Sequence, residues 1–233
     1  MKAYTLIFLL TVTVASSAFA GSGQSIIYHI NKQAYEGYYI SPAENAPLVF
    51  LIHDWDGLTE YEVKRAQMLA DLGYAVFCPD LFGQGVRPTE VKDKRQHTGE
   101  LYKDRNKMRA LMTGAFETAQ DKGAAVDNAV AAGYCFGGAA VLEWARSGHN
   151  LKGFVTFHGG LSTPEGQDYS KTAGSLLILH GTADAMITMD HFAALANELE
   201  SAKVAHEMIT CGGAPPAFTV FGSKRYREDA DKK

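Results

Sequence analysis

The chain has few of the residues and segments that mark several large classes of protein. Its 233 residues include three cysteines, none of them in a Cys-x-x-Cys pair, so the usual motif of a thiol redox protein is absent. Lysine and arginine total 22 against 26 aspartates and glutamates, and no basic stripe is visible, which argues against a nucleic-acid partner. The eight histidines show no metal-ligand spacing, so we predict neither a metal site nor a cofactor.

Long apolar runs are also scarce, because no segment after the first 20 residues is apolar enough to span a bilayer. The beginning of the chain combines Lys2, an apolar run over residues 6–14 and a small-residue ending at Ala20. This order is typical of a secretory signal peptide, whereas a membrane anchor would need a longer run. We therefore expect cleavage after Ala20 and a mature chain of residues 21–233, with one domain, no membrane partner and a periplasmic or secreted location.

Apolar runs alternate with amphipathic segments along the rest of the chain, which predicts an α/β fold with a mainly parallel, doubly wound sheet and helices on both faces. The strands are expected at residues 25–30, 35–40, 48–52, 74–78, 129–132, 153–157, 175–179 and 204–210. The first two should pair as an antiparallel edge. Residues 92–105 are strongly charged and predict a solvated surface. The last residues, from Arg227, resemble the charged opening of a helix, so we expect the sheet to lack its C-terminal covering helix.

One hexapeptide, Gly133-Tyr134-Cys135-Phe136-Gly137-Gly138, stands between a predicted strand and a predicted helix. Strand, Gly-x-Cys-x-Gly and helix is the nucleophile-elbow pattern with cysteine in place of serine. The glycines leave room for a tight turn that exposes the thiol of Cys135. The amide of Phe136 would lie at a helix N-terminus, where it favours a developing negative charge. Taken alone, the hexapeptide is equally compatible with a buried and inert cysteine.

The other members of a catalytic triad should follow in the order acid and then base. Asp184 comes just after a predicted strand, where a carboxylate can reach the mouth of the sheet, although a turn or capping aspartate is the alternative. The base should lie in the loop after the last strand, residues 211–218, but this loop has no histidine. Five histidines lie elsewhere, either near strand ends on the side of the predicted site or after Asp184. Each is expected to have a structural role: His53, His158, His180, His191 and His206.

With these residues in view, the sequence resembles the dienelactone hydrolase family of α/β hydrolases. The resemblance runs from about residue 48 to the end and is carried by four segments. These are the hexapeptide around Cys135, the Asp184 segment, Pro79-Asp80-Leu81-Phe82-Gly83 and Gly212-Gly213-Ala214. The cysteine elbow with its double glycine is fairly specific, whereas the Asp184 segment is shared by many α/β hydrolases.

The resemblance implies roles for individual residues. Cys135 matches the nucleophile, Asp184 the triad acid, and the backbone amides of Trp55 and Phe136 the oxyanion hole. Asp54 stands where the family usually has a glutamate that holds and releases the thiol. The family histidine falls on Pro216, and proline has no proton to transfer.

The family chemistry predicts hydrolysis of a small carboxylic ester or lactone through a thioester on Cys135. An arginine that binds the substrate carboxylate in the family falls near Gln84 here. With Pro216 in the position of the base, we expect this activity to be severely impaired. The alternative is a non-catalytic protein that binds a small molecule on the same scaffold.

Overall fold

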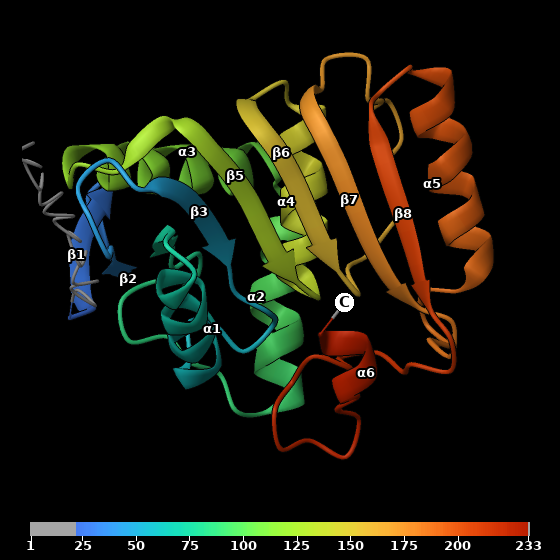
Figure 1. The fold of residues 1–233 in the computed structure, drawn as a ribbon, viewed down its shortest axis with the longest axis horizontal. Coiled ribbons are helices and arrows are strands. Elements are labelled where there is room, and N and C mark those ends of the chain that lie inside the picture. Colours follow the sequence, from blue (N-terminus) through green and yellow to red (C-terminus); the bar gives the residue numbers. More distant parts are fainter. Residues whose placement is uncertain (1–21, 233) are drawn as a thin grey trace, which may run out of the picture.

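The computed structural model describes residues 22–232, so the predicted signal peptide and its cleavage site lie outside the described residues. Eight strands form one sheet in the order β1-β2-β4-β3-β5-β6-β7-β8 (Figure 1). They are β1 (Gln24–Ile30), β2 (Gln33–Ile40), β3 (Pro47–Ile52), β4 (Ala75–Cys78), β5 (Ala125–Tyr134), β6 (Asn150–Phe157), β7 (Ala173–Gly181) and β8 (His206–Cys211). The β1–β2 and β2–β4 pairs are antiparallel and all other pairs are parallel, so the predicted edge pair and the mainly parallel sheet are confirmed.

Helices pack on both faces of this sheet, as the sequence predicts. They are α1 (Glu60–Asp71), α2 (Val91–Lys103), α3 (Arg105–Asp121), α4 (Phe136–Arg146), α5 (Met189–Ser201) and α6 (Glu228–Asp231). The alternation along β3 sends Phe50 into the larger core with α3, α4 and α5, and sends Leu51 into a second core with α1. The ring of Trp144 on α4 lies 5.1 Å from that of Phe50, and both side chains are fully buried.

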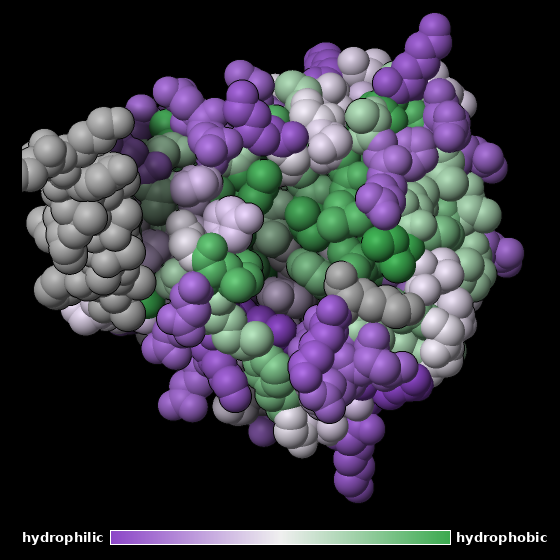
Figure 2. Space-filling model, in the orientation of Figure 1, coloured by the Kyte–Doolittle hydropathy of each residue, from purple (hydrophilic) through white to green (hydrophobic). Residues whose placement is uncertain are grey.

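The second face is less completely covered over the later strands. Val155 on β6, Leu177 on β7 and Ile209 on β8 share this face through their register, and each is half-buried. Figure 2 shows apolar side chains gathered over these strands. None of the helices among residues 22–232 is long and apolar enough to cross a membrane.

The carboxyl ends of the parallel strands meet at one edge of the sheet, where α2 and the segment that carries α6 lie (Figure 1). The C-terminal segment is fixed here because Arg65 on α1 pairs with Asp231 and donates to the carbonyl oxygen of Thr219 at 2.6 Å. Ala230 of α6 is buried with Phe218, so the end of the described chain has a small apolar contact that its charge did not predict.

The charged stretch over residues 92–105 forms α2 and the start of α3. Its prediction as a solvated surface is wrong for one side of α2, because Thr98 and Leu101 are buried. A disulfide between Cys78 and Cys211 is excluded by the topology, since four strands separate β4 from β8 in the sheet. The Cys78 thiol donates instead to the carbonyl oxygen of Glu62 at 3.8 Å.

Candidate active site

The turn between β5 and α4 has the geometry of a nucleophile elbow. Cys135 adopts a φ of 52°, a left-handed conformation that is rare for residues other than glycine and concentrates at functional sites. A Cβ atom at Gly133 would lie 2.4 Å from the backbone of Gly137, and one at Gly137 would lie 2.3 Å from the carbonyl oxygen of Ile52. The two glycines are therefore required for the close packing of this turn, as the sequence indicated.

Cys135 opens onto a cavity of about 560 Å³ at the carboxyl ends of the strands. All six residues that the sequence assigned to the site line it: Asp54, Trp55, Cys135, Phe136, Asp184 and Pro216. The surface of the cavity is largely apolar, and Trp55, Met186 and Ile187 contribute to it. Such a lining suits a small organic ligand rather than a highly charged one.

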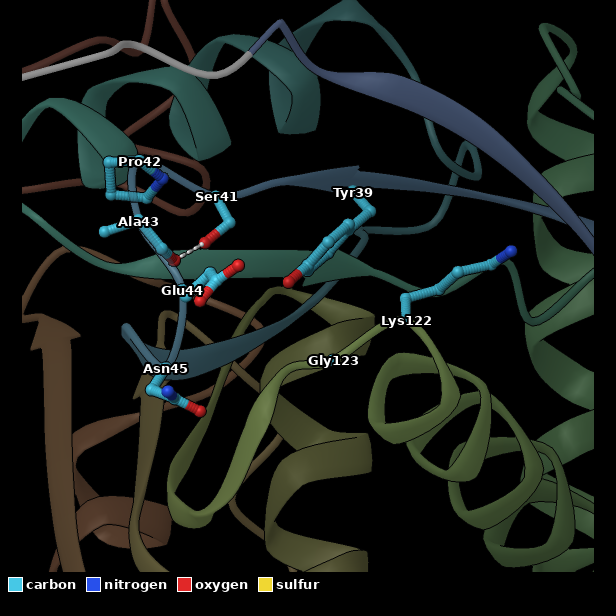
Figure 3. A pocket seen from close by; sticks show the side chains of 8 residues that line it. All are labelled: Tyr39, Ser41, Pro42, Ala43, Glu44, Asn45, Lys122 and Gly123. Atoms are coloured by element: carbon cyan, nitrogen blue, oxygen red, sulfur yellow. Dashed lines mark hydrogen bonds between the residues drawn. The ribbon is translucent and has the colours of Figure 1, made fainter.

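A second hollow of about 580 Å³ contains none of these residues (Figure 3). Its walls come from the loop between β2 and β3 and from Lys122 and Gly123, which lie at the amino ends of the strands. The Ser41 hydroxyl in this hollow donates to the carbonyl oxygen of Ala43 at 2.7 Å, so it serves the loop itself. The predicted site residues gather at the other end of the sheet.

The thiol of Cys135 is protonated at neutral pH. Burial, together with the negative charge of Asp54, raises the pKa of Cys135 to about 12, while the amide of Phe136 acts in the opposite direction. The helix N-terminus therefore does not outweigh the cost of placing a thiolate in this environment. Attack by Cys135 requires that its proton be removed during the reaction.

Asp54 belongs to a group of three carboxylates whose oxygens lie within 4.8 Å of one another, the others being Asp56 and Glu62. Burial, the hydrogen bond to Asp56 and the nearby charges raise the pKa of Asp54 to about 9. Burial also raises the pKa of Glu62 to about 7. Asp56 differs, since its bond to Asp54 and the Lys94 ammonium at 3.3 Å lower its pKa despite burial. At neutral pH Asp54 thus carries a proton that it shares with Asp56.

Asp184 lies in the loop after β7 and is almost fully buried. Its Oδ1 atom accepts the backbone N–H groups of Met186 and Ile187, each at 2.9 Å. These bonds are those of a turn aspartate, which was the alternative interpretation of this residue. They also fix the carboxylate at the wall of the cavity, where its charge acts on the Cys135 thiol.

The histidines near the strand ends have structural partners or surroundings. Both ring nitrogens of His53 are engaged, since Nδ1 lies 2.6 Å from the Asp54 carbonyl oxygen and Nε2 accepts the N–H of Leu81 at 3.1 Å. His180 is fully buried and stacks on the ring of Phe192. His158 is the histidine among the cavity-lining residues, and its Nε2 bonds to Thr219 at 2.8 Å. Burial lowers the pKa of His158 to about 3, so it is a very weak base.

The other two histidines with a predicted structural role do not line the cavity. His191 accepts the backbone N–H of Thr188 and completes the cap of α5, and His206 bonds to the carbonyl oxygen of Val204 at 2.8 Å. Position 216 itself faces the cavity together with Ala217. The structure therefore brings together the three residues at the predicted positions of nucleophile, acid and base, which are Cys135, Asp184 and Pro216.

Three polar residues of the cavity were not predicted from the sequence. Thr98 and Tyr102 come from α2, and Arg225 comes from the segment before α6. A signal for Tyr102 was present, because Thr98, Leu101 and Tyr102 recur at helical spacing within the charged stretch. Arg225 had no such signal, since its position depends on how the C-terminal segment folds back to α1.

Comparison with known proteins agrees with this architecture. A model of the dienelactone hydrolase family matches residues 35–233. The crystal structure of a dienelactone hydrolase-like promiscuous phosphotriesterase from metagenomic libraries is 28% identical and has a TM-score of 0.83, covering 91% of this chain and 93% of that one. A candidate dienelactone hydrolase from Klebsiella pneumoniae, 21% identical, shares the fold with a TM-score of 0.81 over 91% of this chain and 94% of its own. The search of curated proteins gives no match.

Proposed function

Because the chain belongs to the dienelactone hydrolase family, we propose that it cleaves a small carboxylic ester or lactone by nucleophilic attack of Cys135. The observation that carries this proposal is the shared cavity of Cys135 and Asp184, with the cysteine held on the strained turn before α4. A thiol presented in this way is suited to form a thioester with the acyl group of the substrate.

The amides of Phe136 and Trp55 would hold the negative charge that develops on the carbonyl oxygen. Phe136 begins α4, so its N–H belongs to the first turn, whose amide groups have no partner within the helix. The helix dipole adds to this preference for an anion. Donors fixed in this manner before the reaction supply a large share of the catalysis of acyl transfer.

Removal of the thioester is the step that this chain is least equipped to perform. Hydrolysis of an acyl-enzyme requires a base that activates water, and Pro216 occupies the position where that base is expected. The neutral imidazole of His158 has a pKa of about 3 and would activate water poorly. Loss of a triad base costs roughly 10³- to 10⁶-fold in rate, so we propose slow acylation followed by much slower release.

Pre-steady-state kinetics with p-nitrophenyl butyrate test this function. We expect a burst that releases about one equivalent of p-nitrophenolate per protein, followed by very slow turnover, which is the signature of acyl-enzyme accumulation. The Cys135→Ala variant should show no burst. A folded wild-type protein that binds the ester without releasing p-nitrophenolate would contradict the proposal and favour a non-catalytic binding protein.

That second function, binding without catalysis, is favoured by Pro216 alone. The pocket retains its volume and apolar lining without needing a base, so a small ligand could occupy it. The burst experiment separates the two functions because binding leaves Cys135 unmodified.

A further inference from the structure

Tyr102 is a polar residue of the cavity that the proposed reaction does not yet use. It projects from α2, and its ring packs edge-on against Phe136 with a centroid distance of 5.5 Å and an angle of 66°. The guanidinium group of Arg105 lies over the same ring, 4.7 Å from its centroid. Because Phe136 directly follows Cys135, these contacts fix the Tyr102 ring in the wall of the cavity that Cys135 also lines.

The phenol of Tyr102 is protonated throughout the working range of pH. Tyr102 keeps 37% of its surface exposed toward the open cavity, but desolvation by the surrounding protein still raises its pKa, and the negative charge that Cys135 would carry as a thiolate raises it further. Tyr102 and Cys135 line the same cavity. Tyr102 therefore offers an O–H donor, and it does not need to ionise to act.

Acylation of Cys135 leaves a proton-transfer problem that the other cavity residues do not solve. The thiol must lose its proton, and the leaving oxygen of an unactivated ester must gain one. The Thr98 hydroxyl already donates to the carbonyl oxygen of Lys94 at 2.9 Å, and the proton of Asp54 is shared with Asp56. The guanidinium of Arg225 can donate a hydrogen bond, but guanidinium groups do not give up a proton in proteins.

We propose that the Tyr102 hydroxyl transfers a proton to the leaving oxygen of the ester while it accepts the proton of the Cys135 thiol. This inference rests on the proposed function. In the step, the bond from sulfur to the acyl carbon forms and the bond from that carbon to the leaving oxygen breaks. The Tyr102 proton goes to the leaving oxygen to give an alcohol, and the thiol proton replaces it on the phenol oxygen.

This relay avoids forming either the Cys135 thiolate or the Tyr102 phenolate, both of which are unfavourable in the cavity. Neither a free thiolate nor a phenolate is formed as an intermediate, so the burial that raises both pKa values does not oppose the step. The residue touches the reacting atoms, which makes it a catalytic residue in the proposed reaction. The requirement depends on the leaving group. Ethoxide must gain a proton as it departs, whereas p-nitrophenolate leaves as a stable anion, and the thiol proton then passes to water at the open mouth of the cavity.

The test measures butyryl transfer to Cys135 by intact-protein mass spectrometry, with p-nitrophenyl butyrate and ethyl butyrate as two donors of the same acyl group. Tyr102→Phe should slow acylation by ethyl butyrate at least about tenfold more than it slows acylation by p-nitrophenyl butyrate. Tyr74→Phe, which removes a half-exposed phenol from outside the cavity, should change neither rate. A structural role for Tyr102 would slow both donors together.

Failure of the inference and failure of the proposed function are distinguishable. If wild-type protein gains no butyryl group from p-nitrophenyl butyrate, the proposed function is wrong. If the wild type is acylated and Tyr102→Phe loses rate equally with both donors, or with neither, the proton relay is wrong while the thioester chemistry stands. Circular dichroism of Tyr102→Phe confirms that the compared proteins are folded.

Discussion

Replacing Pro216 with histidine is expected to raise the turnover of p-nitrophenyl butyrate by at least about 100-fold, which is the low end of what a positioned general base contributes. The position lines the cavity together with Cys135 and Asp184, so an imidazole there would enter the space between nucleophile and acid. Asp184 is already fixed by two backbone N–H bonds and can orient the new ring. The gain should appear mainly in release of the acyl group, because this step needs activated water.

The chain offers a matched control for this variant. Pro215 precedes Pro216 in the same loop but does not line the cavity, so Pro215→His adds the same imidazole without placing it at the site. Adding Asp184→Asn to Pro216→His should remove most of the gain, since the ring then loses its orienting carboxylate. A folded Pro216→His protein with no gain, or an equal gain from Pro215→His, would show that position 216 is not the vacant base of a triad.

Changing Asp54 to asparagine is expected to make Cys135 much more reactive at high pH. The negative charge of Asp54 raises the pKa of the thiol, and this charge is present once the pH exceeds about 9, the pKa of Asp54 itself. Near neutral pH Asp54 is protonated, so the substitution should leave the alkylation rate by iodoacetamide within about twofold of wild type. Near pH 10 the rate should increase by about tenfold, because each unit of thiol pKa changes the thiolate fraction tenfold.

The pH dependence distinguishes this electrostatic effect from a change in access to the thiol. Easier access would raise the alkylation rate by the same factor at every pH. Glu60→Gln serves as the control, since Glu60 is an exposed acid on the same loop and helix start but does not line the cavity. A ratio between Asp54→Asn and wild type that stays constant from neutral to alkaline pH would contradict the proposed action of Asp54 on the nucleophile.

Much of the fold follows from local patterns in the sequence. The uninterrupted apolar run over β3 predicts a strand buried on both faces, and the structure divides its side chains between two cores. Much of the candidate site could also be predicted from where its residues stand relative to the strands. Cys135 and Asp184 both follow parallel strands, and the carboxyl ends of these strands meet. The glycines around Cys135 could be interpreted from sterics alone, since the turn leaves no room for a Cβ atom.

The remaining features depend on contacts that local patterns do not encode. The burial that raises the pKa of Cys135 arises from several separate segments, whereas the sequence reveals only the helix N-terminus, which acts in the opposite direction. The many charged residues of α2 favoured the prediction of a solvated surface, so the position of Tyr102 in the cavity wall was not predicted. Arg225 reaches the site because the C-terminal segment is anchored to α1 by Arg65 and Asp231, which are 166 positions apart. The pKa of Cys135 and the positions of Tyr102 and Arg225 therefore depend on tertiary packing, which residue spacing in the sequence does not reveal.

The most direct test of the central claim is peptide mapping by mass spectrometry after incubation with p-nitrophenyl butyrate. We predict one butyryl group per protein, located on the peptide that contains Cys135 and stable enough to be isolated because its hydrolysis is slow. The buried thiol of Cys78 should remain unmodified. A folded protein without any acyl group on Cys135, or with the label on another residue, would contradict the assignment of this cysteine as the nucleophile.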